Sequence, residues 1–318
     1  MRLLIVTNMY PTPAEPWFGC FVKEQVDDLL ELGVELELIR FDGRSDKRAY
    51  LRASRDVRSR LRQGGFDLVH AHYGLTGAAT ALAFPRVPLV TTFHGSDYAG
   101  PAWQRFVSTA AALRCTPIVV SPAGRTRLHA ERATVIPMGV NTSLFRPDDR
   151  RAARRLLGWP EDGRYALLAG SRRNPVKGAG LFDAAVQEAR AHLPELTGKA
   201  LEGFGRNDVV LAFNAADVTV VASRSEGSPV TVRESLACET PVVSVDVGDV
   251  SSVIAQLPGC AIVSRDPVSI ADGIYRAIGA PRDSSLRARA ELTSRGAVAQ
   301  QVLNVYRDAL RRSGDRAV

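Results

Sequence analysis

Short apolar runs alternate along the chain with longer stretches in which apolar residues recur at helical spacing. In the first half, runs of aliphatic and β-branched residues predict the strands Leu3–Thr7, Val34–Phe41, Leu68–Ala71, Leu89–Phe93, Ile118–Ser121 and Ala133–Ile136. Helical spacing predicts helices over Phe21–Leu32, the arginine-rich segment between Arg44 and Arg62, and Gly77–Phe84. This alternation is typical of a parallel sheet with helices on both faces.

The second half repeats the alternation after a stretch rich in proline, aspartate and glycine. Predicted strands are Tyr165–Ala169, Asp217–Ala222 and Thr240–Val245, and predicted helices are Leu181–His192 and Ala297–Leu310. A chain of 318 residues exceeds the usual size of a single core. The pattern therefore predicts one domain over residues 1–147, a linker over 148–163 with a short helix, and a second domain over 164–296.

Two carboxylates, Glu226 and Glu234, flank a Gly-Ser-Pro turn that is expected to open a helix. Pro229 suits the first helical position, with Ser228 or Gly227 as the cap before it. Free amides at a helix start attract phosphate, and the two carboxylates would lie roughly 7–8 Å apart along the axis. A capped surface helix is the simpler interpretation. The apolar strands on either side favour a site for a nucleotide sugar instead, because ligands bind at the carboxyl edge of parallel sheets.

A basic loop, Gly170–Gly178, follows the first predicted strand of the second half. Lys177 is a compact point charge, and Arg172 or Arg173 could clamp a diphosphate with two hydrogen bonds. Fixed cations there would stabilise the negative charge of a departing diphosphate. An ordinary basic surface loop is the alternative.

Several segments resemble, in order, those of the retaining glycosyltransferases of family 4, and in particular the teichuronic-acid-type subgroup. They are Met1–Pro11, Asp67–Gly74, Thr92–Asp97, Val135–Asn141, Asn214–Asp217, Glu226–Glu234 and Ala237–Val243. The resemblance covers nearly the whole chain and implies the GT-B architecture, an α/β fold of two doubly wound Rossmann-like domains that face an inter-domain cleft. It also implies that the first domain binds the acceptor, that the second binds the donor, and that a C-terminal helix over residues 297–312 packs back on the first domain.

The resemblance implies transfer of a hexose from a nucleotide diphosphate sugar, with UDP as the expected nucleotide, to an acceptor hydroxyl. The anomeric configuration would be retained by front-face attack. No Asp-x-Asp motif is present to chelate a divalent metal, so metal independence and no cofactor are expected. The acceptor stays open between a natural product, a lipid-linked intermediate and a surface polysaccharide.

Site residues follow from the resemblance together with the residue chemistry. The expected catalytic residues are Glu226, His94 and Lys177. The expected donor-binding residues are Gly19, Arg172, Arg173, Lys177, Gly227, Ser228, Pro229, Val230, Thr231 and Glu234. The expected acceptor-binding residues are Asn8, His72 and Tyr73.

Composition and charge limit the classes of binding partner that are expected. The net charge of +7 is concentrated in the arginine-rich segment, where a solvated helix face is favoured and peripheral contact with an anionic membrane stays open. Nucleic acid is not expected, because aromatic residues are not interleaved with the basic ones. No apolar run approaches the ~20 residues of a membrane span. Met1-Arg2 leads into a strand without a signal-peptide layout, which predicts a cytoplasmic protein, with peripheral attachment at the inner face of the membrane as the alternative.

Two other functions are open at this level. A nucleotide-sugar epimerase of the same architecture would convert its donor without an acceptor. A non-catalytic partner subunit would bind no donor, or would bind one without turnover. The stretch Ala191–Val209 bears on this second alternative, because it is shorter than in the family and lies where the nucleotide base is usually held.

Overall fold

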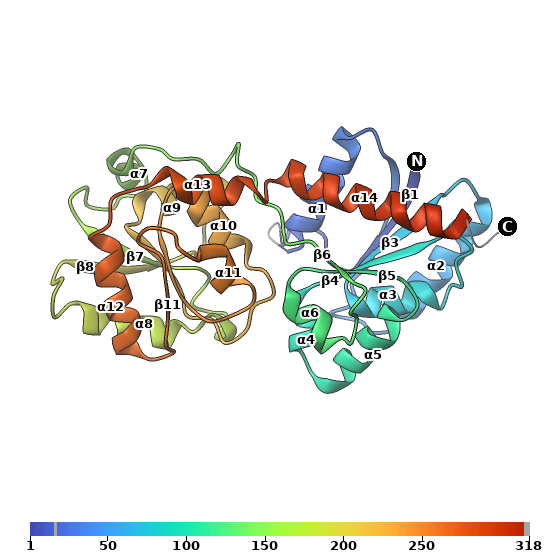
Figure 1. Ribbon diagram of the computed structural model, residues 1–318, viewed down its shortest axis with the longest axis horizontal. Helices are drawn as coiled ribbons and strands as arrows, with labels where there is room; N and C mark the ends of the chain where they lie inside the picture. Colours follow the sequence, from blue (N-terminus) through green and yellow to red (C-terminus); the bar gives the residue numbers. More distant parts are fainter. Residues whose placement is uncertain (16–17, 315–318) are drawn as a thin grey trace. The chain divides into compact units, whose positions relative to one another are not determined.

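The computed structural model describes residues 1–15 and 18–314. These residues form two compact units, each with its own parallel sheet and helices (Figure 1). The first unit contains residues 1–139 and the C-terminal segment from Arg295, and the second contains Val140–Ser294.

The first unit contains a six-stranded sheet in the order β2-β1-β3-β4-β5-β6. Its strands are β1 (Arg2–Thr7), β2 (Glu35–Arg40), β3 (Leu68–His72), β4 (Leu89–Phe93), β5 (Thr116–Val119) and β6 (Thr134–Val135). Its helices are α1 (Cys20–Glu31), α2 (Ala49–Gln63), α3 (Gly74–Ala81), α4 (Gly95–Ala99), α5 (Ala102–Ala112), α6 (Pro122–Arg127) and α14 (Arg295–Gly314). All strand pairs are parallel.

Alternate residues of β1 face opposite sides of this sheet, as the two-residue period of a strand requires. Leu3 and Ile5 pack with apolar residues of α1 and α14 on one face. Leu4 and Val6 pack with Val57 of α2 on the other. Both faces of the sheet are therefore covered, which explains why the strand is apolar at every position from Leu3 to Val6.

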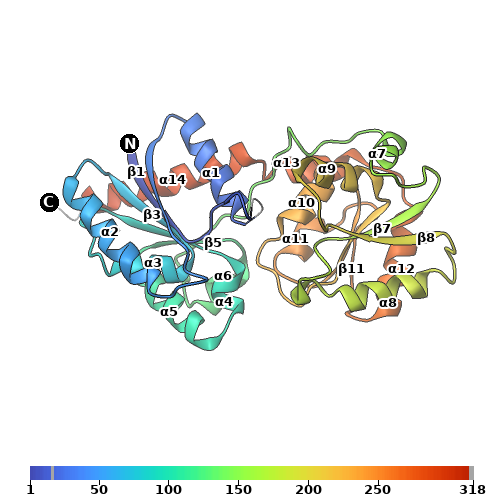
Figure 2. The ribbon, with the colours of Figure 1, turned by 180° about the vertical axis from the view of Figure 1, so that it is seen from behind.

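The second unit contains a five-stranded sheet in the order β11-β10-β9-β7-β8. Its strands are β7 (Arg164–Leu168), β8 (Leu196–Ala200), β9 (Val218–Val221), β10 (Val242–Val245) and β11 (Ala261–Val263). Its helices are α7 (Arg150–Leu156), the 3-10 turn η1 (Pro175–Lys177), α8 (Ala179–Ala189), α9 (Arg206–Ala215), α10 (Val230–Ala237), α11 (Val250–Ile254), α12 (Pro267–Ile278) and α13 (Ser284–Glu291). Figure 2 shows α8 and α12 side by side on one face of the sheet, where they pack on Ala166 and Leu168.

The observed division differs from the domain limits expected from composition. Residues 148–163 were predicted as a linker, but they belong to the second unit. The cause is Arg154 of α7, which is buried and pairs with Asp217 at an N–O distance of 2.9 Å. The C-terminal helix begins at Arg295 and ends at Gly314, and its Val298 and Val302 pack into the core of the first unit.

Several elements were not predicted from the sequence. The stretch Ala191–Val209, which we expected to be shorter than in the family, contains β8 and the first residues of α9. In the described residues, no helix is both long enough and apolar enough to cross a bilayer.

Candidate active site

The second sheet reverses its strand order at β7, because β8 lies on one side of β7 and β9 on the other. Such a switch point is where open α/β sheets bind ligands, at the carboxyl ends of the strands. The loop Gly170–Gly178 follows β7, and the loop Ser223–Pro229 follows β9. Both basic and acidic residues predicted from the sequence therefore lie at this switch point.

Two glycines allow close approaches at this edge, Gly178 beside the end of β9 and Gly248, in the loop after β10, beside the loop after β9. Gly178 has φ +72°, and a Cβ there would lie 2.0 Å from the carbonyl oxygen of Ala222. Gly248 has φ +61°, and a Cβ there would lie 2.5 Å from the carbonyl oxygen of Gly227. Glycine is required at both positions, because any side chain would push the loops apart.

Lys177 and Glu226 form an ion pair at this point. The Lys177 Nζ donates to Glu226 Oε1 at 2.7 Å, although the two residues are 49 positions apart in the chain. Their side chains are only 21% and 14% exposed. The backbone bond from Arg224 N to the Val176 oxygen, at 2.8 Å, holds the same two loops together. A cation and a carboxylate in fixed positions are thus available to one ligand.

The start of α10 lies directly after Glu226 and differs slightly from expectation. Pro229 was predicted at the first helical position, but it is the N-cap residue, and the helix begins at Val230. Ser228 does not cap the helix; its hydroxyl donates to Asp249 Oδ2 at 2.9 Å. Val230 and Thr231, both partly exposed, form the first turn. Their amides have no partner further back in the helix, which makes this turn a suitable place for phosphate.

A buried ion pair connects helix α10 to the loop after β10. Arg233 of α10 donates to Asp249 Oδ2 at 2.6 Å, and both side chains are almost inaccessible. Asp249 thereby links α10 to the loop after β10, as well as binding Ser228. Sequence analysis did not identify this pair, because neither residue lies within a spacing that indicates contact.

Glu234 is buried one turn further along α10, with a side chain only 3% exposed. Arg206 at the start of α9 donates to Glu234 Oε1 at 2.6 Å. The Arg206 guanidinium also lies over the ring of Phe145, 4.7 Å from its centre. Arg206 was missed from the sequence, since it lies 28 positions before Glu234 in a segment with no strong periodicity.

The two arginines of the basic loop have separate carboxylate partners. Arg172 forms an ion pair with Asp183 of α8. Arg173 is highly exposed, and its Nε lies 2.7 Å from Glu202 Oε1. The sequence left the choice between Arg172 and Arg173 open. Among the described residues, neither arginine forms a hydrogen bond or an ion pair with Lys177.

In the first unit, the predicted histidines lie at the carboxyl ends of neighbouring strands. His72 ends β3, and His94 follows β4 as the N-cap of α4. Their rings are stacked with centres 5.7 Å apart. Among the described residues, neither nitrogen of His72 has a hydrogen-bond partner, nor does His94 Nε2. Buried polar atoms without partners are rare in folded proteins, so these three nitrogens mark a place for a polar ligand.

Burial keeps these imidazoles neutral. It lowers the pKa of His94 to about 4 and that of His72 well below its usual value. The neighbouring His70 is used within the fold: Nδ1 lies 2.6 Å from the Tyr306 hydroxyl and Nε2 lies 2.8 Å from the Thr92 hydroxyl. A neutral imidazole donates one hydrogen bond and accepts another, as binding of a hydroxyl requires.

Asp97 holds the loop that carries His94. Its carboxylate accepts from His94 N and from Gly74 N, both at 2.7 Å. Burial raises the pKa of Asp97 to about 7, although these amide hydrogen bonds act in the opposite direction. The spacing of an acidic residue three positions after a helix cap is the sequence signal that could have identified this role.

The other predicted residues of the first unit, Asn8, Tyr73 and Gly19, lie in loops outside its helices and strands. Asn8 follows β1, and its amide donates to the Tyr50 hydroxyl at 3.0 Å. Tyr73 is the N-cap of α3 at φ 85°, an unusual backbone for a bulky residue. Burial raises the pKa of Tyr73 to about 12, so its hydroxyl remains protonated near neutral pH. Gly19 has φ +72°, and a Cβ there would lie 2.4 Å from the Met9 carbonyl carbon, so the close approach of this backbone requires glycine.

Across residues 1–15 and 18–314, no group of three or more His, Cys, Asp or Glu side chains is arranged to hold a metal ion. The four cysteines are all free thiols.

Comparisons with known proteins show the family and the fold of this chain. Residues 5–144 match the family model described as Glycosyltransferase Family 4, and residues 167–279 match the one described as Glycosyl transferases group 1. A D-inositol 3-phosphate glycosyltransferase of Acidothermus cellulolyticus is 30% identical, over 78% of this chain and 68% of its own. TuaC of Bacillus subtilis, named for teichuronic acid biosynthesis, is 24% identical over 87% of this chain and 89% of its own.

Solved structures share the fold at lower sequence identity. Sucrose-phosphate synthase of Thermosynechococcus elongatus aligns with a TM-score of 0.78 and 18% identity, covering 98% of this chain and 100% of that one. HepE of Anabaena, in complex with UDP and glucose, aligns with a TM-score of 0.67 and 19% identity, covering 97% and 98%.

The two parallel α/β units match the GT-B architecture of the aligned structures. The chain belongs to glycosyltransferase family 4. The family and fold class predicted from the sequence are thereby confirmed.

Proposed function

We propose that this glycosyltransferase transfers a hexose from a UDP-sugar to an acceptor hydroxyl, with retention of configuration and without a metal ion. The observation that carries the proposal is the Lys177–Glu226 ion pair at the switch point of the second sheet. It places a cation and a carboxylate directly before the first turn of α10. The HepE structure supports UDP as the nucleotide, because that protein has this fold and was solved with UDP and glucose.

Each group of the donor has a matching partner in this arrangement. Lys177 and the amides of Val230 and Thr231 would bind the diphosphate, since all of them present positive charge or N–H donors. Glu226 would accept hydrogen bonds from the sugar hydroxyls, and Glu234 those from the ribose. Donor binding would exchange the Lys177–Glu226 contact for contacts with the ligand, so both residues contribute to the same event.

The proposed reaction needs no covalent nucleophile. The acceptor oxygen attacks the anomeric carbon from the face on which the diphosphate departs, and the bond between that carbon and the phosphate oxygen breaks. The departing phosphate oxygen takes the proton of the acceptor hydroxyl. Lys177 and the amides of the first turn stabilise the negative charge that the diphosphate gains, which lowers the barrier.

The polar residues of the first unit are proposed to bind the sugar and the acceptor. His94 would hydrogen-bond to the transferred sugar through Nε2, and Asn8, His72 and Tyr73 would bind the acceptor. The unpartnered ring nitrogens of His72 and His94 support these roles. Both imidazoles are neutral near pH 7, so they orient hydroxyls and add no charge.

The proposal is tested by donor binding and by transfer. We expect one member of a nucleotide-sugar panel to raise the melting temperature, since a ligand at a hundred times its Kd adds about 2.7 kcal/mol to the free energy of unfolding. Glu226→Gln and Lys177→Met should each lower transfer by at least about tenfold without unfolding the protein. Lys23→Met is the matched control, because Lys23 also forms a 2.7 Å ion pair, with Asp27, but on the exposed face of α1.

Three outcomes would contradict the proposal. Normal turnover in both site variants would remove these residues from the reaction. Conversion of the donor sugar without any acceptor would indicate an epimerase. Donor binding without transfer to any acceptor would indicate a non-catalytic subunit.

A further inference from the structure

Three neighbouring hollows on the first unit are lined by arginine without any acidic residue. One of about 500 Å³ lies beside Leu89 and Thr116, the first residues of β4 and β5. The other two lie along α2 and beside Phe84, and they share Arg58 and Arg62. Among the described residues, no Asp or Glu lines any of the three. Their exposed arginines include Arg55, Arg58, Arg62, Arg86, Arg114 and Arg312, which together with Phe84 are called the arginine surface below.

The charge of this surface is not neutralised within the fold. In the part of the chain that the structure describes, none of its arginines forms an ion pair with a carboxylate. Other arginines of the same helix do: Arg52 pairs with Asp46 and Arg60 with Glu37. On helix α2, Arg52 and Arg60 are therefore paired with carboxylates, whereas among the described residues the arginines that line the hollows are not.

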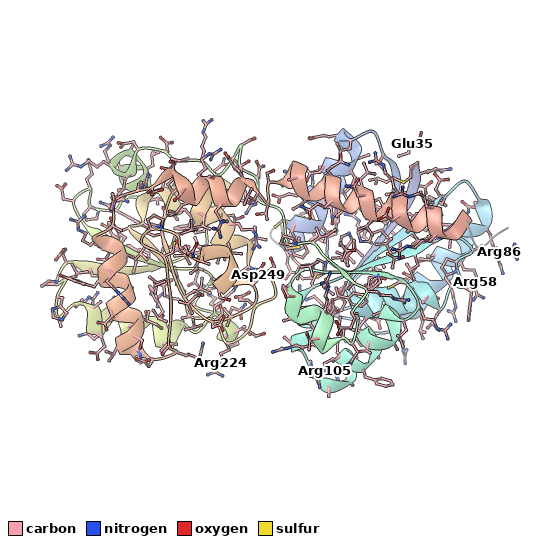
Figure 3. All side chains as sticks on the ribbon, viewed as in Figure 1. Glu35, Arg58, Arg86, Arg105, Arg224 and Asp249 are labelled. Atoms are coloured by element: carbon pink, nitrogen blue, oxygen red, sulfur yellow. The ribbon has the colours of Figure 1, made fainter. Side chains whose placement is uncertain are left out.

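Exposed apolar side chains lie among these arginines. Phe84 is 70% exposed at φ 51°, a backbone region that is costly for an aromatic residue. Leu82 beside it is 55% exposed, and Leu51 on α2 is 58% exposed. Arg58 contacts both residues of this segment: its guanidinium donates to the Leu82 oxygen at 3.1 Å and lies 5.8 Å from the centre of the Phe84 ring. Figure 3 shows Arg58 and Arg86 on the same flank of this unit.

We propose that the arginine surface docks on an anionic lipid bilayer. A surface of arginines with protruding apolar side chains matches the headgroup region of such a membrane, where charge attracts and apolar groups insert. A soluble polyanion would satisfy the arginines but would leave Phe84 and Leu82 in water. A bilayer offers anionic headgroups to the arginines and an apolar interior to Phe84 and Leu82. The combination of charged and apolar side chains therefore favours lipid.

The position of the surface separates docking from catalysis. Leu89 and Thr116 begin their strands, so the hollow beside them lies at the amino edge of the sheet. His72 and His94 lie at the opposite, carboxyl edge. Docking on a membrane therefore leaves the candidate site of this unit uncovered, and the proposal does not rest on the proposed reaction.

The test is vesicle binding of the full-length protein. We expect it to sediment with vesicles of phosphatidylcholine and phosphatidylglycerol in equal parts and to remain in solution with phosphatidylcholine alone. Added salt should release it, because the attraction is electrostatic. The Arg55→Gln/Arg62→Gln double variant should bind about twenty-fivefold more weakly, since each arginine near an anionic surface contributes about fivefold. Phe84→Asn should weaken binding severalfold and keep the fold, because asparagine tolerates a positive φ.

The matched control is the Arg52→Gln/Arg60→Gln double variant, which removes the same charge from the same helix but from paired positions. It should bind as the unaltered protein does. Equal losses in the two double variants would show that only net charge matters and would overturn the proposal. Absence of binding to the anionic vesicles, or equal binding to both vesicle types, would also overturn it. Transfer to a water-soluble acceptor should be unchanged in the arginine variants, whereas Glu226→Gln should lose transfer and keep vesicle binding.

Discussion

Replacing Gly178 by alanine perturbs the candidate site through the backbone alone. The substitution adds one methyl group and removes no charge or hydrogen bond. The added Cβ would lie 2.0 Å from the Ala222 oxygen at φ +72°, so the loop after β7 must move away from the end of β9. Lys177 is the preceding residue, and its contact with Glu226 depends on this approach.

Two contributions set the expected loss of stability and activity in Gly178→Ala. A residue with a Cβ in the left-handed region costs roughly 1–2 kcal/mol relative to glycine. Relief of the contact with Ala222 requires a displacement on the order of 1 Å, which at a catalytic group can lower activity about a hundredfold. We therefore expect the free energy of unfolding to fall by about 2 kcal/mol, which corresponds to about 4–8 °C in melting temperature for a domain of this size.

Gly180→Ala provides the control two residues away. Gly180 lies in α8 with nothing within 4 Å of its ideal Cβ, so alanine there should be neutral or slightly stabilising. Thermal unfolding and steady-state kcat/KM are measured for both variants. The reasoning is refuted if Gly178→Ala retains the melting temperature and activity of Gly180→Ala.

Further predictions concern stability and metal use. Asp217→Asn should destabilise the protein by about 3–5 kcal/mol in urea unfolding, because it leaves buried Arg154 without its carboxylate partner; a change below about 1 kcal/mol would contradict this. Folded-state pKa values below 6.5 mean that the buried histidines bind protons on unfolding, so stability should fall as pH drops from 6.5 toward 4, while the raised pKa of Asp97 opposes this in part. His94→Gln should reduce the dependence of the free energy of unfolding on pH by about 1.4 kcal/mol per pH unit. An unchanged pH dependence would contradict the lowered pKa of His94. A chelator should leave transfer unchanged, and loss of activity that Mg²⁺ restores would refute metal independence.

The sequence predicts most strands of both sheets, because they are short runs rich in aliphatic and β-branched residues. β8 escaped prediction because Leu196–Ala200 contains glycine and lysine and lies near the sheet edge, where fewer side chains are buried. The domain limits were misplaced for a different reason. Proline, aspartate and glycine around residue 150 indicate a linker, but the buried Arg154–Asp217 pair incorporates this stretch into the second unit.

The candidate site could be predicted only in its parts. Glu226 and the turn before α10 were recognised from local spacing, since cap, proline and acidic residue lie within a few positions. The pairing of Glu226 with Lys177 could not be, because it depends on the approach of two loops that Gly178 permits. Arg206 was missed for the same reason: its contact with Glu234 is set by how α9 packs against α10.

The most direct test of the central claim is a crystal structure of the protein with a bound UDP-sugar. We predict that the diphosphate lies within hydrogen-bonding distance of Lys177 Nζ and of the amides of Val230 and Thr231, and that Glu226 binds the sugar hydroxyls. A diphosphate bound elsewhere, with the 2.7 Å contact between Lys177 and Glu226 unchanged, would contradict the account.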